Sequence, residues 1–204
     1  MNKVLIGTPY HKCKKYIYEE FVKNIEGIQN NSRILIKDNS KGNKDSRINM
    51  LESLKYLAFK FLEGNYTHFF LVEADLLPKQ EIINELIKHD KDVVSAVYPI
   101  CKRKSIFNIT QNFYLANNKT FSNLFVNPGF LDGTLKKVPL GAGLGCILIK
   151  RKVLESIRFR SGQWHPDIYF WQDLKAYGFQ GYIDTSIIVK HYPNGASSIE
   201  KEVK

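Results

Sequence analysis

The sequence predicts an α/β protein with a mostly parallel central sheet and helices on both faces. Short apolar runs alternate along the chain with stretches whose apolar residues recur at helical spacing. Clusters of Gly, Pro, Asn, Asp and Ser separate several of these stretches. The 204 residues show no internal repeat, low-complexity tract or linker, so we expect one domain over residues 1–204.

The first two predicted strands flank the first predicted helix. Val4–Gly7 is a short apolar run and predicts a buried strand. Tyr16–Ile28 predicts a helix because its apolar residues recur near helical spacing. Arg33–Lys37 predicts a second strand, and a polar turn follows at residues 38–43.

The next predicted helix has signals at both ends. Asp45 or Ser46 can cap its N-terminus, and Gly64 stands where a C-terminal cap is expected. One apolar stripe joins these ends, formed by Ile48, Leu51, Leu54, Ala58 and Phe61 or Leu62. Apolar patterning then predicts a strand, a helix and a strand, at His68–Glu73, Gln80–His89 and Asp92–Tyr98.

The second part of the chain begins with an interruption. Residues 101–137 are rich in Asn, Phe and Gly and predict a hairpin or an ordered loop over the sheet. The alternation then resumes, with strands and helices expected at Gly145–Ile149, Arg151–Ile157, Pro166–Tyr177, Gln180–Asp184 and Ile187–Lys190.

The formal net charge of +10 permits two interpretations. The lysines either form a solvated surface or face an anionic partner, such as a nucleotide, a nucleic acid or an acidic membrane surface. The basic clusters at residues 102–104 and 150–152 are too short to decide between them. Because the aromatic residues form no known RNA-binding motif, a nucleic-acid partner is not expected.

The expected location of the protein follows from three absences in the sequence. The three cysteines form no C-x-x-C pair, which favours a reducing compartment. No apolar run approaches the roughly 20 residues of a membrane span, and no signal peptide is visible. We expect a cytoplasmic protein (host cytoplasm if the source is a virus), at most peripheral to a membrane.

Polar residues gather where the predicted strands end, which is where open α/β sheets bind ligands. Thr8, Pro9 and Tyr10 follow the first strand, Asp38 follows the second, and the pair Glu73 and Asp75 follows the third. Two carboxylates one residue apart suit a hard divalent cation, since Mg²⁺ prefers one or two carboxylates together with substrate phosphates. The alternative is that the two acids merely end the strand and cap the next helix.

Glu73-Ala74-Asp75 resembles the D-x-D motif of GT-A fold glycosyltransferases, in particular the small family-two-like enzymes of bacteria, phages and archaeal viruses. The resemblance implies that Asp75 and Glu73 hold Mn²⁺ or Mg²⁺ and that Ala74 lies against the nucleotide sugar. Glu73 replaces the family's first Asp, so its longer side chain could reach the ribose or a metal-bound water instead. Asp75 is therefore the safer ligand.

Two further segments resemble the same family. Residues 46–49 are similar to its R-N element, which implies that Arg47 reaches the diphosphate or the acidic turn. Residues 140–149 are similar to its glycine-rich acceptor segment, which implies that Gly141 and Gly143 lie beside the acceptor. The alternatives are a solvated arginine and a bulge that enters a buried strand.

The spacing of Asp167, Phe170 and Gly178 resembles the family's E-D motif, with Pro166 in place of the Glu. The resemblance implies that Asp167 is the base that takes the proton of the acceptor hydroxyl in an inverting transfer. Asp173 on the same predicted helix remains a rival base. Aromatic side chains near this motif, Trp164 among them, are candidates for stacking on the acceptor sugar.

His191 follows the last predicted strand, where a C-terminal His of many GT-A enzymes completes the metal site. A structural role is the alternative for a lone His, although imidazole suits Mn²⁺ well. The resemblance places the nucleotide base at the end of the first strand, where Tyr10 could stack on uracil or guanine. Asp38 is placed to contact the base or ribose, with a plain turn as the alternative.

Together these features predict a metal-dependent glycosyltransferase that moves a sugar from a UDP- or GDP-linked donor to a hydroxyl of a glycan, protein or lipid. Residues 1–100 would bind the donor, and residues 101–204 the acceptor. A sugar-1-phosphate nucleotidyltransferase is one alternative, but residues 7–11 lack the Gly-rich, Arg- and Lys-containing loop of such enzymes. The other is a non-catalytic nucleic-acid or carbohydrate-binding protein on the same fold.

Overall fold

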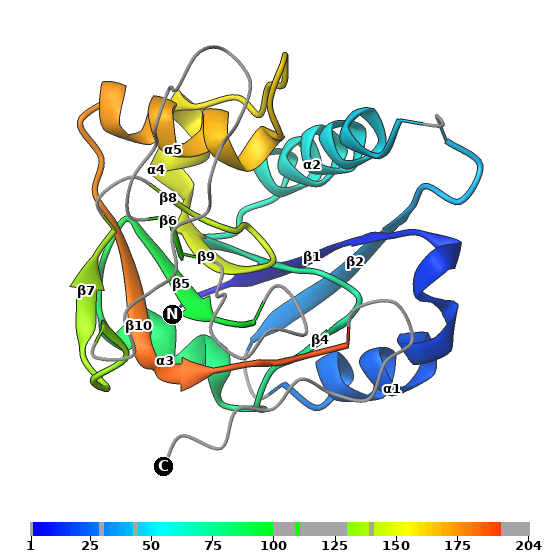
Figure 1. Ribbon diagram of the computed structural model, residues 1–204, viewed down its shortest axis with the longest axis horizontal. Coiled ribbons are helices and arrows are strands. Elements are labelled where there is room, and N and C mark those ends of the chain that lie inside the picture. Colours follow the sequence, from blue (N-terminus) through cyan, green and yellow to red (C-terminus); the bar gives the residue numbers. More distant parts are fainter. Residues whose placement is uncertain are drawn as a thin grey trace.

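The computed structural model describes residues 2–28, 31–42, 45–99, 109–110, 130–138 and 141–192. A seven-stranded sheet forms the centre, in the order β2-β1-β3-β9-β5-β10-β7 (Figure 1). Its strands are β1 (Val4–Tyr10), β2 (Ser32–Asp38), β3 (His68–Val72), β5 (Val93–Val97), β7 (Leu135–Lys137), β9 (Cys146–Lys150) and β10 (Gly181–Ile188). Only β9 and β7 run antiparallel to their neighbours in this sheet, so the predicted mostly parallel sheet is confirmed.

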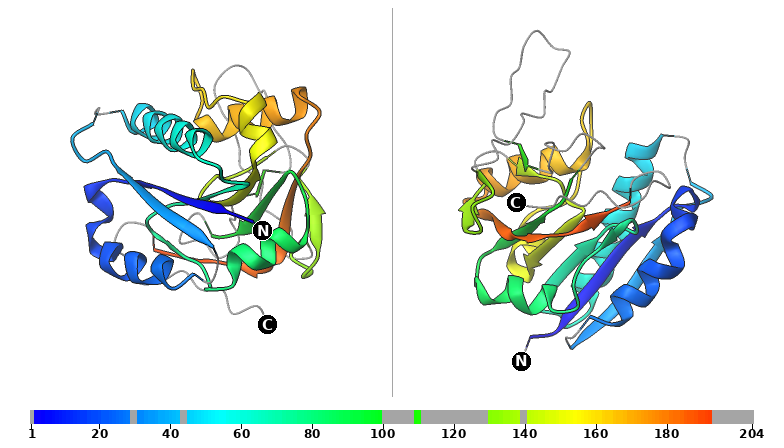
Figure 2. Two further views of the ribbon diagram at one scale, coloured as in Figure 1. Left: turned by 180° about the vertical axis from the view of Figure 1, so that it is seen from behind. Right: turned by 60° about the horizontal axis from the view of Figure 1, so that its bottom comes forward.

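Helices cover both faces of the sheet, as the alternation predicted (Figures 1 and 2). One layer contains α2 (Ser46–Glu63), α4 (Arg151–Ser156) and α5 (Pro166–Ala176). The other contains α1 (Lys15–Glu26), which follows the 3₁₀ turn η1 (Lys12–Lys14), and α3 (Ile82–Lys88). Within the described residues, no helix combines the length and apolar character that a membrane crossing needs.

β3 shows why the apolar run before Glu73 is continuous. Phe69 and Leu71 pack into the core under α2, α4 and α5, whereas Phe70 and Val72 pack into the core under α1 and α3. Side chains alternate between the two faces of a strand, so the part of a central strand that is covered by apolar cores on both sides forms a continuous apolar run. The carboxylates begin only where β3 ends, at the edge of the sheet.

Two short strand pairs lie outside the main sheet. β4 (Leu76–Leu77) pairs antiparallel with β11 (Lys190–His191), and β6 (Ile109–Thr110) pairs antiparallel with β8 (Gly141–Ala142). The β4–β11 pair brings the end of the described chain against the turn after β3. The hairpin or loop predicted for residues 101–137 lies largely outside the described residues, although β7 pairs with β10.

The structure corrects two sequence predictions about where strands begin and end. The strand predicted at Gln180–Asp184 and the start of the one predicted at Ile187–Lys190 form one strand, β10, whose pairing with β5 shifts register between Asp184 and Ile188, whereas Lys190 belongs to β11. β1 is longer than predicted and includes Thr8, Pro9 and Tyr10. Pro9 has no N–H to donate, and it lies beyond the part of β1 that pairs with β3.

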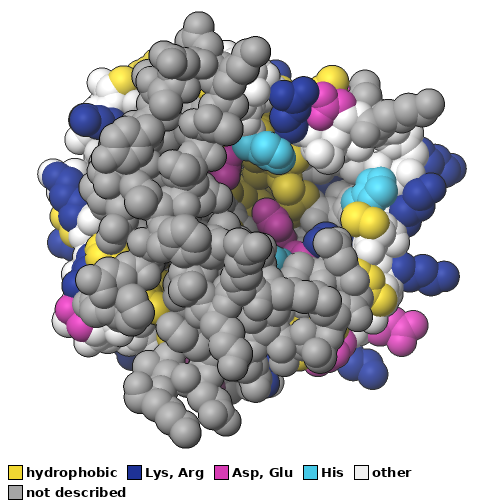
Figure 3. Space-filling model, in the orientation of Figure 1, with side chains coloured by type: hydrophobic (Ala, Val, Ile, Leu, Met, Phe, Trp, Pro, Cys, Tyr) yellow, Lys and Arg dark blue, Asp and Glu magenta, His cyan; other side chains and the backbone are white. Residues whose placement is uncertain are grey.

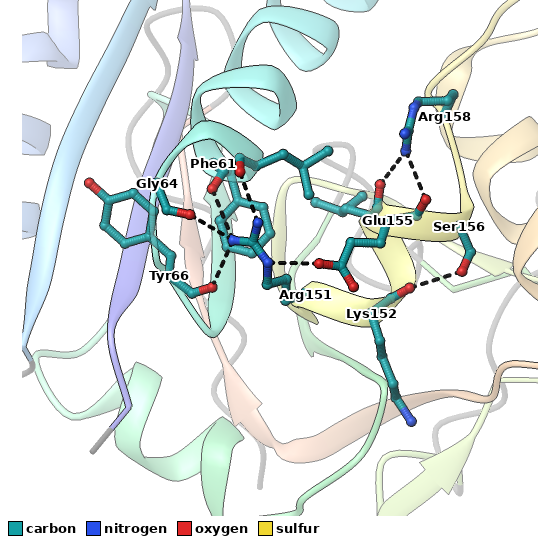
Figure 4. A network of polar contacts seen from close by, with 10 residues as sticks. Phe61, Gly64, Tyr66, Arg151, Lys152, Glu155, Ser156 and Arg158 are labelled. Carbon is teal, nitrogen blue, oxygen red and sulfur yellow. Dashed lines mark hydrogen bonds and ion pairs between the residues drawn. The ribbon is translucent and has the colours of Figure 1, made fainter.

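The ends of α2 illustrate a prediction that held and one that did not. Asp45 caps the N-terminus, where its Oδ1 accepts a hydrogen bond from Arg47 N at 2.8 Å. Gly64, however, has an extended backbone and not the left-handed conformation of a glycine cap. Arg151 provides hydrogen-bond donors to the carbonyls at the C-terminal end of α2 instead. Its guanidinium donates to four of them, those of Phe61, Leu62, Gly64 and Tyr66 (Figure 4).

Candidate functional site

A cavity of about 550 Å³ opens at the carboxyl ends of β1, β2 and β3. The molecular surface in Figure 3 is hollowed, and acidic and histidine side chains gather around the hollow. Residues from the ends of all three strands, from η1 and from the first turns of α2 line the cavity: Pro9, Tyr10, His11, Lys12, Cys13, Lys14, Asn39, Ser40, Gly42, Ser46, Asn49, Met50, Ser53, Glu73, Ala74 and Asp75.

The turn Glu73-Ala74-Asp75 is held by backbone hydrogen bonds on both sides. Glu73 N donates to the carbonyl of Gly145 at 2.8 Å, which ties the start of the turn to the segment before β9. Tyr192 N donates to the carbonyl of Asp75 at 2.9 Å, which ties its end to the residue after β11. Because β3 and β9 are central strands, this turn has a fixed position relative to the sheet.

Asp75 is fully buried and is the centre of a charged cluster. Its Oδ2 accepts from Lys14 Nζ and lies 3.2 Å from His191 Nε2. Its Oδ1 has no hydrogen-bond partner among the described residues. Burial alone would raise the pKa of Asp75, but the hydrogen bond with His191 and the charge of Lys14 outweigh burial and lower it. Asp75 is therefore a carboxylate.

His191 contacts Asp75 through a ring orientation set by the backbone. Its Nδ1 lies 2.5 Å from the carbonyl of Pro99, and a carbonyl only accepts, so Nδ1 carries a proton. The other nitrogen, Nε2, faces Asp75. Burial lowers the pKa of His191, but the hydrogen bond with Asp75 outweighs it, and the net shift is upward.

Glu73 lies in a different environment from Asp75. Burial raises the pKa of Glu73 to about 7, and the negative charge of Asp75 adds to this rise. Tyr98 packs beneath the same turn, where its hydroxyl accepts a hydrogen bond from Gly145 N at 2.9 Å. A Cβ at Gly145 would lie 2.6 Å from that hydroxyl oxygen, so only glycine fits there without a shift.

Asp167 lies in the first turn of α5, where Ile168 N donates to its Oδ1 at 2.9 Å. Burial raises the pKa of Asp167 above that of an ordinary aspartate. A second cavity of about 40 Å³ has both Glu73 and Asp167 in its wall, together with Pro9, Met50, Leu54, Leu71, Leu144, His165 and Pro166. The structure thus brings Asp167 to the acidic turn, 94 positions earlier in the sequence.

The rival base Asp173 points elsewhere. Both of its carboxylate oxygens accept from Arg160, from Nε at 2.8 Å and from Nη2 at 2.7 Å. Asp173 lines neither of the two cavities. Geometry therefore favours Asp167 over Asp173 as the carboxylate that faces the site.

Several predicted donor-side residues lie beside the larger cavity and do not line it. Thr8 is fully buried. Asp38 is exposed and accepts a hydrogen bond from Ser40 N at 2.7 Å. This contact forms a plain turn, which was the alternative to a nucleotide contact for Asp38. Arg47 pairs with Asp45 and donates to the carbonyl of Gln163 at 3.2 Å.

The predicted acceptor-side residues lie in β8, directly after it, or shortly before α5. A Cβ at Gly141 would lie 3.0 Å from Trp171 Cδ1, so this glycine makes room for a core tryptophan. Trp171 Nε1 donates to the carbonyl of Ala142 at 2.5 Å and fastens β8 to α5. Gly143 and Trp164 are half-buried, and neither lines the two cavities.

Sequence reasoning missed two groups in the larger cavity. Lys14 pairs with Asp75, and the only sequence signal for it is the basic run at residues 12–15 directly after the first strand. Asn39 donates through Nδ2 to the carbonyl of Asn49 at 2.5 Å and to Ser53 Oγ, which joins the end of β2 to α2. Both groups depend on contacts between separate elements, which no local pattern encodes.

The part of the chain that the structure describes supplies only part of a donor set for a metal ion. Among the described residues, no group of three or more His, Cys, Asp and Glu side chains is arranged to hold a metal. The unpartnered Oδ1 of Asp75 fits one position of a divalent ion, and Nε2 of His191 fits a second once it gives up the proton that it donates to Asp75. Mg²⁺ ordinarily completes such a partial set with substrate phosphates and waters.

No protein-family model matches the chain, and no curated protein matches it. Among solved structures, the chain is similar to A197 from STIV, with a TM-score of 0.62, 16% identity, and coverage of 100% of this chain and 92% of that one. It is also similar to S. aureus TarS 1–349 in complex with UDP-GlcNAc, with a TM-score of 0.55, 12% identity, and coverage of 93% of this chain and 57% of that one. These likenesses establish the GT-A fold that the sequence resemblance predicted.

Proposed function

We propose that the protein is a metal-dependent glycosyltransferase that moves a sugar from a nucleoside-diphosphate sugar to an acceptor hydroxyl. One observation carries this proposal. A charged carboxylate, Asp75, and a second carboxylate, Asp167, belong to adjoining cavities with Glu73 in the wall of both. Such an arrangement provides one acidic group for the donor's cation and another for the acceptor's proton.

The larger cavity supports a nucleotide-sugar donor. Its volume of about 550 Å³ lies within the range of small-molecule sites. Tyr10 offers an aromatic face for a base, and Asn39 with Ser40 offers polar groups for base and ribose. UDP-GlcNAc is bound in the TarS structure, which has the same fold. We propose a UDP- or GDP-linked donor. Thr8, Asp38 and Arg47, which do not line the cavity, are proposed as further residues of the donor-binding region.

The proposed metal ligands are Asp75 and His191, with Glu73 as a further candidate. Bound Mn²⁺ or Mg²⁺ would neutralise the charge that develops on the leaving nucleoside diphosphate. Glu73, with a pKa of about 7, is the weaker candidate because it is largely protonated below neutral pH. This ranking agrees with the expectation that Asp75 is the safer ligand.

Asp167 is the proposed base. Its carboxylate takes the proton of the acceptor hydroxyl as the hydroxyl oxygen forms a bond to the anomeric carbon. The bond between that carbon and the diphosphate oxygen breaks at the same time, and the electron pair leaves with the diphosphate. Attack from the face opposite the leaving group inverts the anomeric centre. Burial, which raises the pKa of Asp167, makes it a stronger base than an exposed aspartate.

The acceptor is proposed to lie over β8 and the start of α5, beside Gly141, Gly143 and Trp164. The contact of Trp171 with Ala142 supports this placement, because it fixes β8 next to the helix that carries Asp167. A hydroxyl of a glycan, a protein or a lipid would suit the proposed chemistry.

A panel of nucleotide sugars tests the proposal. UDP- and GDP-sugars are incubated with the full chain in MnCl₂, in MgCl₂ or in EDTA, and the released nucleoside diphosphate is measured. Slow hydrolysis of one donor with metal, and none with EDTA or with the Asp75→Asn variant, is expected. Release of pyrophosphate from a nucleoside triphosphate and a sugar phosphate would instead indicate a nucleotidyltransferase. Absence of any turnover and of any nucleotide binding would exclude both enzymes.

A further inference from the structure

Lys14 occupies the position where a cation would contact Asp75. Its ammonium forms an ion pair with Asp75 Oδ2, and its side chain is 25% exposed. The residue belongs to η1, directly after β1, so the ammonium enters the cluster from the cavity side. His191 approaches the same oxygen from β11, which leaves Oδ1 without a partner among the described residues.

An ammonium and a divalent ion compete for this carboxylate. Each neutralises the charge of Asp75, and their like charges repel at the short distance that sharing one carboxylate requires. Asp75 is fully buried, so water screens this repulsion poorly. A metal ion that binds Asp75 must therefore displace Lys14 from Oδ2 or bind with much reduced affinity.

A diphosphate provides the displaced ammonium with a second anion. Lys14 lines the same cavity as Glu73 and Asp75, so a diphosphate bound to a metal on Asp75 would lie within this cavity. The lysine side chain is long and flexible, and its ammonium is a common phosphate ligand. Among the cavity-lining residues, Lys12 is the other lysine, and it belongs to the same 3₁₀ turn.

We propose that Lys14 holds Asp75 when the donor is absent and moves to the diphosphate when metal and nucleotide bind together. Lys14 is thus a donor-binding residue that makes metal binding dependent on the nucleotide. This inference rests on the proposed function, since it assigns a residue to the diphosphate of the same donor. It explains why a buried carboxylate suited to a metal carries a resident ammonium.

Metal binding to the full chain, measured by isothermal titration calorimetry, tests the inference. MnCl₂ is titrated alone and with saturating UDP or GDP. In Lys14→Met, Mn²⁺ alone should bind about tenfold tighter than in wild type, whereas the nucleotide with saturating Mn²⁺ should bind about tenfold weaker. Lys14→Gln is a second variant that keeps a neutral donor near Asp75, and the same two changes are expected.

Lys15→Met is the matched control, since it removes the same charge from the exposed first residue of α1. Equal Mn²⁺ affinity in the Lys14 variants and in Lys15→Met would overturn the inference. One comparison needs no substitution: wild type should bind Mn²⁺ at least about tenfold tighter with saturating nucleotide than without it, and equal affinity would also overturn the inference. If wild type binds no nucleotide, the proposed function fails, while the titration with Mn²⁺ alone still tests Lys14.

Discussion

Glu73 and Asp75 stand one residue apart but meet opposite electrostatic environments. Asp75 keeps its charge because His191 and Lys14 both face Oδ2. Glu73 has no such ion pair among the described contacts, and burial with the nearby charge of Asp75 raises its pKa to about 7. The pKa values of two acids that share one turn are thus shifted in opposite directions, and a motif of residue types does not show this difference.

The role of Asp167 is testable by a conservative substitution. Asp167→Asn keeps the side-chain shape but removes the base, so kcat should fall about 10²- to 10⁴-fold. Nucleotide affinity should stay unchanged, because Asp167 lines the smaller cavity and not the larger one. Asp173→Asn is the control and should keep most of the activity, since Asp173 pairs with Arg160. Equal losses in both variants would contradict the assignment of Asp167.

The pH dependence of activity follows from the same residue. A base works only when deprotonated, so kcat/KM should fall as the pH drops through the pKa of Asp167. Burial raises this pKa, and the acid side of the profile should therefore lie above the 3.8 of an ordinary aspartate. Steady-state rates across the acid range measure it. A profile whose acid side lies at or below that value would assign the proton transfer to another group.

At the scale of elements, Arg151 connects two helices that are distant in sequence. It is the first residue of α4, and its guanidinium donates to carbonyls at the C-terminal end of α2 (Figure 4). Helix ends leave carbonyls without partners, and a cation there also complements the helix dipole. The capping role expected of Gly64 is therefore performed from outside the helix.

Removal of this contact should destabilise the fold. Arg151→Ala leaves several carbonyls at the end of α2 without their charged donor, and we expect a loss of about 2–4 kcal/mol in the free energy of unfolding. Lys152→Ala is the control, since its exposed ion pair with Asp92 should contribute less than about 1 kcal/mol. Urea denaturation measures both. Similar free energies of unfolding in the two variants would show that the hydrogen bonds of Arg151 do not stabilise the end of α2.

Gly145 packs closely against Tyr98 and Leu76, and its carbonyl holds the acidic turn. A larger side chain at this position should therefore lower both stability and donor affinity. In Gly145→Ala the new methyl group would meet Tyr98 Oη at 2.6 Å and Leu76 Cδ1 at 2.9 Å, so we expect a cost of about 1–3 kcal/mol. Donor affinity should fall as well, because the carbonyl of Gly145 accepts from Glu73 N. In the double variant with Tyr98→Phe, the total cost in urea denaturation should be smaller than the sum of the two single costs. Additive costs would contradict a direct clash.

For the whole molecule, the basic cluster at residues 150–152 is largely neutralised within the fold. Lys150 pairs with Asp90, Arg151 with Glu155, and Lys152 with Asp92. Each side chain of this cluster therefore has an acidic partner within the fold. Lys14, by contrast, faces a cavity.

Nucleotide should stabilise the whole chain only when the metal ion is also present. Nucleotide at about 100 times its Kd adds about 2.7 kcal/mol, which corresponds to a rise of several degrees in Tm for a chain of this size. We expect this rise with UDP or GDP plus Mn²⁺, and not with the nucleotide in EDTA. Differential scanning fluorimetry measures it, and Asp75→Asn should abolish it. A full rise in EDTA would contradict the metal requirement.

Much of the fold could be predicted because its signals are local. The run Phe69–Val72 is apolar throughout since both faces of β3 are covered, and Asp45 caps α2 through a contact two residues away. The predictions failed where a distant group decides the outcome. Arg151, and not a glycine cap at Gly64, provides donors to the end of α2, and β10 continues past Asp184 because it pairs with β5 on both sides of a shift in register.

The sequence by itself determined the alternation of strands and helices, the place where β3 ends in two acids, and the candidate base at the start of α5. Only the tertiary structure decided which of these groups meet. Lys14 lies 61 positions from Asp75, and His191 lies 116 positions from it, yet both contact the same carboxylate oxygen. Periodicity and capping depend on neighbours along the chain. Contacts across the chain depend on strand order, and at this site strand order places an ammonium on the acid that the sequence predicts for a metal.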